Sequence, residues 1–379
     1  MKRFDEWMEA ALYSPGGGFY ERGGAAGGAR GDFITSPEVG PLFGAVVARA
    51  VAGLFEELGI EHGHVVEVGA GRGALAVSML TAGLPEGCRY VAVERSAALR
   101  VRAGELLGDR AEVVASLDEA VELLGGGAID GGAIDGGAIG GGAIDGETFD
   151  GETFDGEIFD GVTFDGVIVA NELLDNLPFR ILERTDEGWA DLHVVDDGHD
   201  DRPQPRPVLL RESDRNPVGF PQQKGSGLGS GLGTRLPVID AASSWVDDAR
   251  RRLRRGRVIA FDYGVATTAE LVDRPWLRTY VGHQRGDDPF AATTGTCDIT
   301  TDIAIDQLPT PTSAGTQAEW LRRHGIDDLV AEGKAVWAER AHLGDLEAIR
   351  ARSRVNEAEA LLDPAGLGAF LVTEWDPAP

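Results

Sequence analysis

A glycine-rich turn with acidic residues on both sides offers the clearest chemistry in this sequence. Residues 67–73 read EVGAGRG, with a glycine at every second position after Glu67. Glycine permits a tight turn and lets a ligand approach the backbone closely. If a helix begins there, its free N–H groups and its dipole favour a carboxylate or a phosphate. Glu94 ends the next expected strand, where an acid can accept both hydroxyls of a ribose. Together these features predict a site for a ribose-bearing cofactor.

Two cofactors fit a turn of this kind. Dinucleotide sites favour the spacing GxGxxG, whereas Gly69, Gly71 and Gly73 give GxGxG. Glu67 suits the amino group of a methionine moiety and would be unwelcome beside a pyrophosphate. The spacing therefore favours S-adenosylmethionine, with a nicotinamide dehydrogenase and a purely structural turn as the alternatives.

A second polar cluster, NELLDNLP at 171–178, directly follows an expected strand. In an open α/β sheet, ligands lie beyond the carboxyl ends of the strands. Glu172 and Asp175 are three residues apart, so they share one side if this turn is helical. A capping segment with solvated acids is the alternative.

Several further residues carry weaker signals. Asp32 lies in GDFITSP, which by itself reads as a turn with a cap at Ser36. The sequence DYG at 262–264 ends another expected strand, and His283 stands alone. His62 and His64 have no third ligand nearby, so we expect no metal site.

Alternating patterns predict an α/β fold with a parallel sheet. A β-branched strand at 64–68 is followed by a helix at 74–80 and a strand at 89–95, which is a βαβ unit. Before it, helices are expected over 4–12 and from Ser36, with Pro37 in the first turn. Further expected elements are helices at 96–107 and 243–256 and strands at 166–171, 257–264 and 368–375.

Two segments read as loops. Residues 126–165 form eight five-residue units that switch from GGAID to GETFD. Each unit offers little apolar area to offset chain entropy, so we expect a mobile insertion. A stacked solenoid is the alternative, although its glycines would weaken the stacking. Residues 196–236, rich in Asp, Pro, Gly and Ser, are expected to be a long acidic loop.

Composition restricts the partners. The 379 residues carry a net charge of −28, which argues against nucleic acid and against an anionic membrane surface. This charge fits a basic partner, or it serves solubility alone. No apolar run approaches the roughly 20 residues of a membrane helix. Cys88 and Cys297 form no disulfide framework. We expect a cytoplasmic protein without membrane insertion, and a homodimer stays open.

The ordered motifs resemble the MidA family of methyltransferases. The similarity rests on GDFITSPEVGPLFG, VVEVGAGRG, ANELLDNLP, FDYG, GTCDITTDIAID and EAEALLDPAGLGAFLV. It implies a class I fold, with a mostly parallel seven-stranded sheet whose last strand is antiparallel, plus a helical insertion. For the mitochondrial members it implies symmetric dimethylation of an arginine in a complex I subunit. The repeat and the acidic loop depart from the family pattern, which leaves the partner undefined.

The resemblance and the expected elements divide the chain. We predict an N-terminal helical extension at 1–62 and a Rossmann-like core at 63–274. A helical, substrate-binding insertion would follow at 275–360, and residues 361–379 would add the last strand of the core.

The expected site combines a cofactor half and a catalytic half. Gly69, Gly71 and Gly73 would seat S-adenosylmethionine, with Glu67 at its amino group and Glu94 at its ribose. Asn171 belongs to the same set.

The catalytic half follows from the chemistry of an arginine acceptor. A guanidinium is protonated and a poor nucleophile, and two carboxylates can bind it bidentately. Glu172 is the first candidate and Asp175 the second. Asp32 would close the site, and His283 would take the released proton. A small-molecule methyltransferase and a noncatalytic assembly factor that binds the cofactor are the competing functions.

Overall fold

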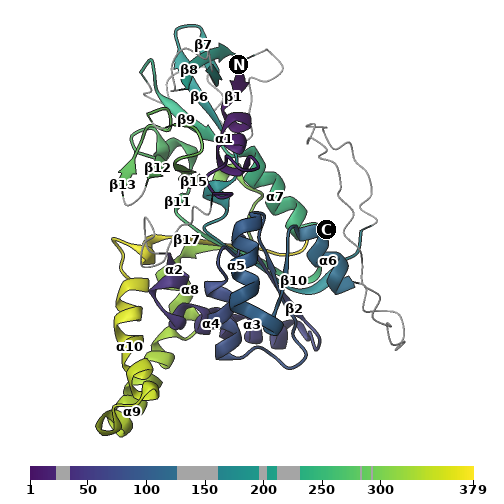
Figure 1. Ribbon diagram of the computed structural model, residues 1–379, viewed down its shortest axis with the longest axis vertical. Helices are drawn as coiled ribbons and strands as arrows, with labels where there is room; N and C mark the ends of the chain where they lie inside the picture. Colours follow the sequence, from purple (N-terminus) through teal and green to yellow (C-terminus); the bar gives the residue numbers. More distant parts are fainter. Residues whose placement is uncertain (23–34, 126–160, 196–202, 211–230, 282–283, 292) are drawn as a thin grey trace.

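The computed structural model describes residues 1–22, 35–125, 161–195, 203–210, 231–281, 284–291 and 293–379 (Figure 1). Most of the repeat and much of the acidic loop lie outside the described residues.

A seven-stranded sheet forms the centre of the molecule, in the order β16-β17-β10-β5-β2-β3-β4. The strands from β4 to β10 along this order are parallel, and β17 runs antiparallel to both of its neighbours. The family resemblance implied this mostly parallel sheet with a reversed last strand, and the structure confirms it. The strands are β2 (His64–Val68), β3 (Tyr90–Val93), β4 (Glu112–Val114), β5 (Phe164–Asn171), β10 (Leu253–Asp262), β16 (Ser313–Thr316) and β17 (Leu371–Trp375).

Helices cover both faces of this sheet, because its central strands are buried on both sides and rich in valine and isoleucine. Val66 and Ile168 face one apolar cluster, and Val65 and Val167 face the other. The first cluster is covered by α1 (Phe4–Tyr13), α6 (Leu117–Gly125) and α7 (Asp240–Arg251). The second is covered by α3 (Pro41–Leu58), α4 (Ala74–Ala82), α5 (Ala97–Leu107), α8 (Gln317–Arg323) and α10 (Leu346–Leu361).

A second, antiparallel sheet lies at one end of the molecule (Figure 1). Its strands are β1 (Lys2–Arg3), β6 (Arg180–Thr185), β7 (Gly188–Val195), β8 (Gln204–Leu209) and β9 (Arg235–Val238). The expectation of a continuous loop over 196–236 is therefore wrong at β8 and β9. Pro205 and Pro207 argued against a strand here, because proline in a sheet is largely confined to edge strands; among the described strands, β8 pairs with β7 alone.

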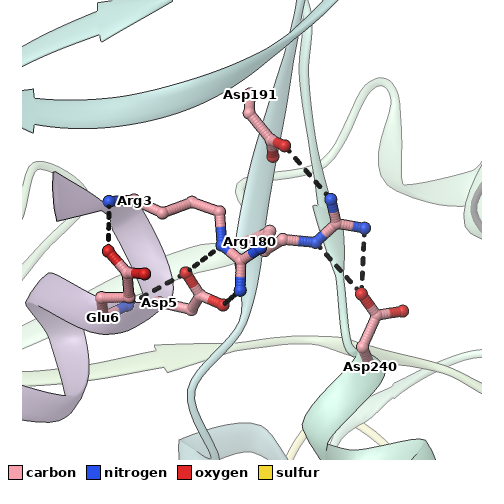
Figure 2. Close-up of polar contacts among 6 residues, drawn as sticks. All are labelled: Arg3, Asp5, Glu6, Arg180, Asp191 and Asp240. Carbon is pink, nitrogen blue, oxygen red and sulfur yellow. Dashed lines mark hydrogen bonds and ion pairs between the residues drawn. The ribbon is translucent and has the colours of Figure 1, made fainter. Parts of the chain in front are cut away.

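Arg180 of β6 joins the antiparallel sheet to α7, and Arg3 makes contacts within the N-terminal segment (Figure 2). The Arg180 guanidinium lies 3.2 Å from Asp191 of β7 and 2.9 Å from Asp240, the first residue of α7. Arg3 pairs with Asp5 at 2.6 Å, and its backbone N–H donates to Glu6 at 2.9 Å. These contacts lie within the N-terminal segment, which is attached to the antiparallel sheet by the pairing of β1 with β7.

Residues 275–360 are less helical than expected. Their first part forms β12 (Leu277–Val281), β13 (Gln284–Gly286) and β14 (Asp298–Thr301), followed by β16 of the central sheet. A short pair, β11 (Gly264–Val265) and β15 (Ile303–Ala304), lies beside them. Only then come α8, α9 (Ile326–Arg340) and α10, of which α9 and α10 form an arm at the far end from the antiparallel sheet (Figure 1).

The basic segment 243–256 changes from helix to strand earlier than its sequence suggests. Helix α7 ends at Arg251, and Leu253 already pairs with Phe164 in β5. Arg254 and Arg255 both bind Asp165, which holds the pKa of that carboxyl down at about 2. Asp165 closes the last repeat unit, so the insertion does not extend to the end of the repeat.

The helix expected from Ser36 is interrupted at Gly40. A four-residue helix, α2 (Ser36–Val39), precedes α3, and Thr35 rather than Ser36 holds its cap position. Ser36 is buried and donates to Gln317 Oε1 at 2.9 Å. The break arises because the residue before Pro41 is disfavoured in the helical region. A Cβ at Gly40 would also lie 2.3 Å from Glu357 Cδ.

Glu357 of α10 caps α3 from a distant part of the chain, and its loss should destabilise the fold. Its Oε2 accepts from the backbone N–H of Leu42 at 2.8 Å, and the residue is 6% exposed. Replacing it by alanine is expected to cost about 1–2 kcal/mol, as for other helix caps. Urea unfolding measures this, with the exposed Glu359→Ala on the same helix as control. Equal stability of the two variants would contradict the capping role.

Candidate active site

A cavity of about 490 Å³ opens at the carboxyl ends of the parallel strands. The turns after β2, β3, β4 and β5 form most of its wall, together with the end of α1 and the start of α2. This is where an open α/β sheet binds its ligands, and the volume lies within the roughly 300–1,000 Å³ of small-molecule pockets.

The glycine turn forms one wall through its backbone. Gly69, Gly71 and Gly73 have φ angles of 76°, 56° and 85°, a region that side chains rarely adopt. Gly69 and Gly71 line the cavity, and no atom lies within 4 Å of a Cβ built on Gly71. Gly73 does not line it; this residue holds the N-cap position before α4 and lies beside Leu107. Its contribution is the shape of the turn.

Glu94 holds the glycine turn and also faces the cavity. Its Oε2 accepts from the backbone N–H of Gly71 at 2.8 Å, and its Oε1 from that of Ser96 at 2.7 Å. Burial raises its pKa, while these two bonds act in the opposite direction. A carboxylate offers about four lone-pair sites, so each oxygen can still accept a hydroxyl. Glu94 can therefore accept hydrogen bonds from the two hydroxyls of a ribose in the cavity.

Glu67 lines the cavity beside α4. Its Oε2 accepts from the Tyr90 hydroxyl at 2.7 Å, and burial raises its pKa to about 8 despite that bond. A nearby cation, such as the ammonium group of a methionine moiety, would stabilise the ionised form of this carboxyl.

Glu172 and Asn171 line another part of the cavity, where each has an oxygen with no hydrogen-bond partner among the described residues. Glu172 has a φ of 52°, and no other described residue except glycines has a positive φ. Its backbone N–H donates to Phe261 O at 2.8 Å, and its Oε1 accepts from Asn171 Nδ2 at 3.2 Å. Glu172 Oε2 and Asn171 Oδ1 are buried without a partner in the described part of the chain. Burial and then Asp175 raise the pKa of Glu172 to about 8. Backbone strain of this kind concentrates at functional sites.

Asp175 does not share that wall. Its backbone N–H and that of Leu174 both donate to Asp262 Oδ2, at 3.1 and 2.9 Å. These bonds start the short 3₁₀ turn at Leu174–Asn176, after Glu172 rather than through it. The Asp175 carboxyl instead accepts from the Tyr263 hydroxyl, and burial raises its pKa to about 7. The expected helical pairing of Glu172 with Asp175 is thus wrong, although the two groups repel each other.

Asp298 of the GTCDITT motif organises a hydrogen-bond network under the cavity. Its Oδ1 accepts from Asn176 Nδ2 and from the Tyr20 hydroxyl, both at 2.9 Å. The Tyr13 hydroxyl donates to Asn176 Oδ1 at 2.9 Å, and the two tyrosines stack with ring centroids 5.3 Å apart. Both tyrosines line the cavity. Sequence reasoning missed them because a lone tyrosine near a loop carries no spacing signal.

Two sequence candidates cannot be placed. Asp32 and His283 lie outside the described residues. Across the described ranges, no three His, Cys, Asp or Glu side chains gather as metal ligands, and no helix is long and apolar enough to cross a bilayer.

The sheet order, its reversed β17 and the glycine turn at its edge define a class I methyltransferase fold. Comparison with known proteins then places the chain. Residues 46–324 match the family described as "Putative S-adenosyl-L-methionine-dependent methyltransferase", and the chain belongs to this family. The resemblance to MidA-type methyltransferases is confirmed.

Solved structures agree with the fold. A Burkholderia thailandensis protein bound to S-adenosyl-homocysteine is 24% identical, with a TM-score of 0.70, over 98% of this chain and 87% of its own. An uncharacterized protein from the same organism is 25% identical, with a TM-score of 0.71, over 99% and 87%. No curated protein matches this chain. S-adenosylmethionine is therefore the cofactor, and the dehydrogenase alternative is excluded.

Proposed function

We propose that this methyltransferase acts on an arginine side chain of a protein. The observation that carries the proposal is the Oε2 atom of Glu172 on the wall of the cofactor cavity, which is buried and has no partner in the part of the chain that the structure describes. Asn171 Oδ1 lies beside it in the same condition. A guanidinium has five N–H donors and a positive charge, so it satisfies such acceptors and offsets the ionisation of a carboxyl whose pKa is raised. The net charge of −28 also suits a basic protein substrate.

The residues of the chain would position and activate the acceptor. When bound, the cofactor supplies an electrophilic methyl group. Glu172 would hold one guanidinium nitrogen pair and keep positive charge away from the attacking nitrogen, which must lie in line with the breaking bond. One nitrogen–carbon bond forms, one sulfur–carbon bond breaks, and one proton leaves the guanidinium. His283 is the proposed acceptor of that proton, and Asp32 would close the site from the N-terminal side.

Labelled S-adenosylmethionine tests this function. The purified protein is incubated with a lysate of cells lacking it, and the label is located. Label in a protein band, together with one methylarginine lost from the proteome of those cells, is the expected result. Label found only in small solutes supports the small-molecule methyltransferase, and cofactor binding without turnover supports the noncatalytic assembly factor.

Glu94→Ala should weaken cofactor binding, and the ribose assignment can be separated from the effect on the glycine turn. Calorimetry would compare S-adenosyl-homocysteine with its 2′,3′-dideoxyribose analogue. The wild type is expected to prefer the natural ligand by roughly 10-fold to 100-fold, since hydrogen bonds to a charged group contribute about 1.5–3 kcal/mol. Glu94→Ala should bind both ligands weakly and nearly equally. A variant that keeps the full preference would remove Glu94 from the ribose, whatever its absolute affinity.

A further inference from the structure

Glu38 is a further acidic residue on the cavity wall. It lies in α2, between Pro37 and the break at Gly40, and lines the same cavity as the glycine turn. Its Oε2 is buried and has no hydrogen-bond partner in the described parts of the chain. The segment that carries it is fixed on both sides, by the bond from Ser36 to Gln317 and by the packing of Gly40 against Glu357.

The position of α2 brings Glu38 to Glu172. Ser36, two residues before Glu38, lies near the Glu172 carboxyl, and burial, Asp175 and, to a lesser degree, the charge of Glu38 raise the pKa of Glu172. Two residues from distant parts of the sequence therefore present carboxyl oxygens to one cavity. Two carboxylates alone would only repel each other, and carboxylates on a protein surface are usually hydrated. Within the described ranges, each of these two carboxyls has one oxygen that is shielded from solvent and has no hydrogen-bond partner.

Asn171 adds a neutral acceptor to the two acids. Its amide nitrogen already donates to Glu172, which turns its Oδ1 away as an unpartnered acceptor. Three buried oxygens on one cavity thus have no donor among the described residues, and leaving such atoms unpaired is costly. The described wall contains two arginines, Arg72 and Arg95, but neither bonds to these oxygens, and Arg95 donates to Glu9 at 3.0 Å. A planar cation with several N–H groups matches this set better than a single-point ammonium does.

We infer that Glu38 binds the methyl acceptor directly and forms, with Glu172, a two-carboxylate clamp for a guanidinium group. This inference rests on the proposed function and extends it. Glu172 and Glu38 would each accept from different guanidinium nitrogens, and Asn171 Oδ1 would accept a further N–H. The clamp draws one carboxylate from the turn after β5 and the other from α2, so it assembles only in the folded chain.

The test uses the full-length protein saturated with S-adenosyl-homocysteine and two probes, N-acetyl-arginine methylamide and N-acetyl-lysine methylamide. We expect the wild type to prefer the arginine probe, and Glu38→Gln to weaken that probe at least tenfold. Affinity for S-adenosyl-homocysteine should stay within twofold, which also shows that the variant is folded. Glu57→Gln, an exposed acid on α3, is the matched control and should leave both affinities unchanged.

The outcomes separate this inference from the proposed function. Equal affinity of wild type and Glu38→Gln for the arginine probe, or no binding of that probe to the wild type, overturns the clamp. Arginine methylation in the lysate assay would still leave the function standing in that case. If Glu38→Gln loses the arginine probe but no protein arginine is ever labelled, the clamp stands and the catalytic function fails. Glu38→Asp keeps the negative charge, so it should bind the arginine probe more tightly than Glu38→Gln does.

Discussion

Glu172→Gln is expected to lower methyl transfer by roughly a hundredfold or more, with S-adenosyl-homocysteine bound as in the wild type. Losses of this size follow removal of one electrostatic group aimed at the reacting centre. Glutamine has nearly the same shape as glutamate, but it removes the negative charge and turns an acceptor into a donor. Because Glu172 Oε2 has no partner among the described residues, the substitution breaks no structural bond there. Single-turnover kinetics measure the effect, and near-normal turnover would remove Glu172 from catalysis.

The same variant should be more stable than the wild type at alkaline pH. The pKa of Glu172 is raised to about 8 in the folded protein, chiefly by burial. A carboxyl with a raised pKa contributes stability below its ordinary value of about 4.5, and this contribution is lost as pH rises through about 8. Glutamine does not titrate, so its advantage in melting temperature should be larger at pH 9 than at pH 5. A constant difference between the two pH values would mean that Glu172 is not buried as a titrating group.

The opposed effects on activity and stability would identify Glu172 as a site residue rather than a structural one. Its φ of 52° adds strain that a residue in a turn would ordinarily avoid. Residues that line a cavity although they lower the stability of the fold are typical of functional sites.

Local chemistry explains which elements the sequence predicted well. Strand β2 spans the expected 64–68, because a β-branched run is followed at once by glycines that cannot continue it. The reversed last strand, β17, was predicted from the family resemblance and falls within the expected 368–375. Elements that depend on distant partners were placed less well. The break between α2 and α3 involves Glu357, and β8 exists only against β7.

The candidate site shows the same division. The strand-end rule brought Glu67, Glu94 and Glu172 to one cavity, because parallel strands deliver their carboxyl ends to one edge. The orientation of Asp175 could not be predicted, since it depends on backbone bonds to Asp262, 87 residues away. Glu38 lies in the helix expected from Ser36, within GDFITSPEVGPLFG, where the sequence pattern assigned it no role. Its place beside Glu172 follows from how α2 packs, which no spacing in the sequence reveals.

Gly256→Ala is expected to be the most destabilising single substitution discussed, lowering the free energy of unfolding by about 3–5 kcal/mol, because overpacking and backbone strain give the largest single-mutant effects. Gly256 of β10 pairs with Gly166 of β5 at the start of the two central strands. It has φ 136°, and a Cβ there would lie 1.7 Å from Gly166 O. Contacts of this kind cannot be relieved by a side-chain rotation, because the obstacle is backbone. The positive φ adds further strain for any L-residue. Urea unfolding measures the loss.

The same crowding continues into the next strand, so the sheet cannot easily shift to make room. A Cβ on Gly166 would itself lie 2.1 Å from His64 O of β2. Gly104→Ala on α5 is the matched control: no atom lies within 4 Å of its Cβ, and alanine should stabilise that helix by up to about 1 kcal/mol. The register fixed by Gly256 carries Asp262 to the far end of β10, where its carboxylate binds the turn after Glu172. Gly256→Ala should therefore also weaken S-adenosyl-homocysteine binding by displacing that turn, and unchanged stability and affinity would contradict the close packing of these strands.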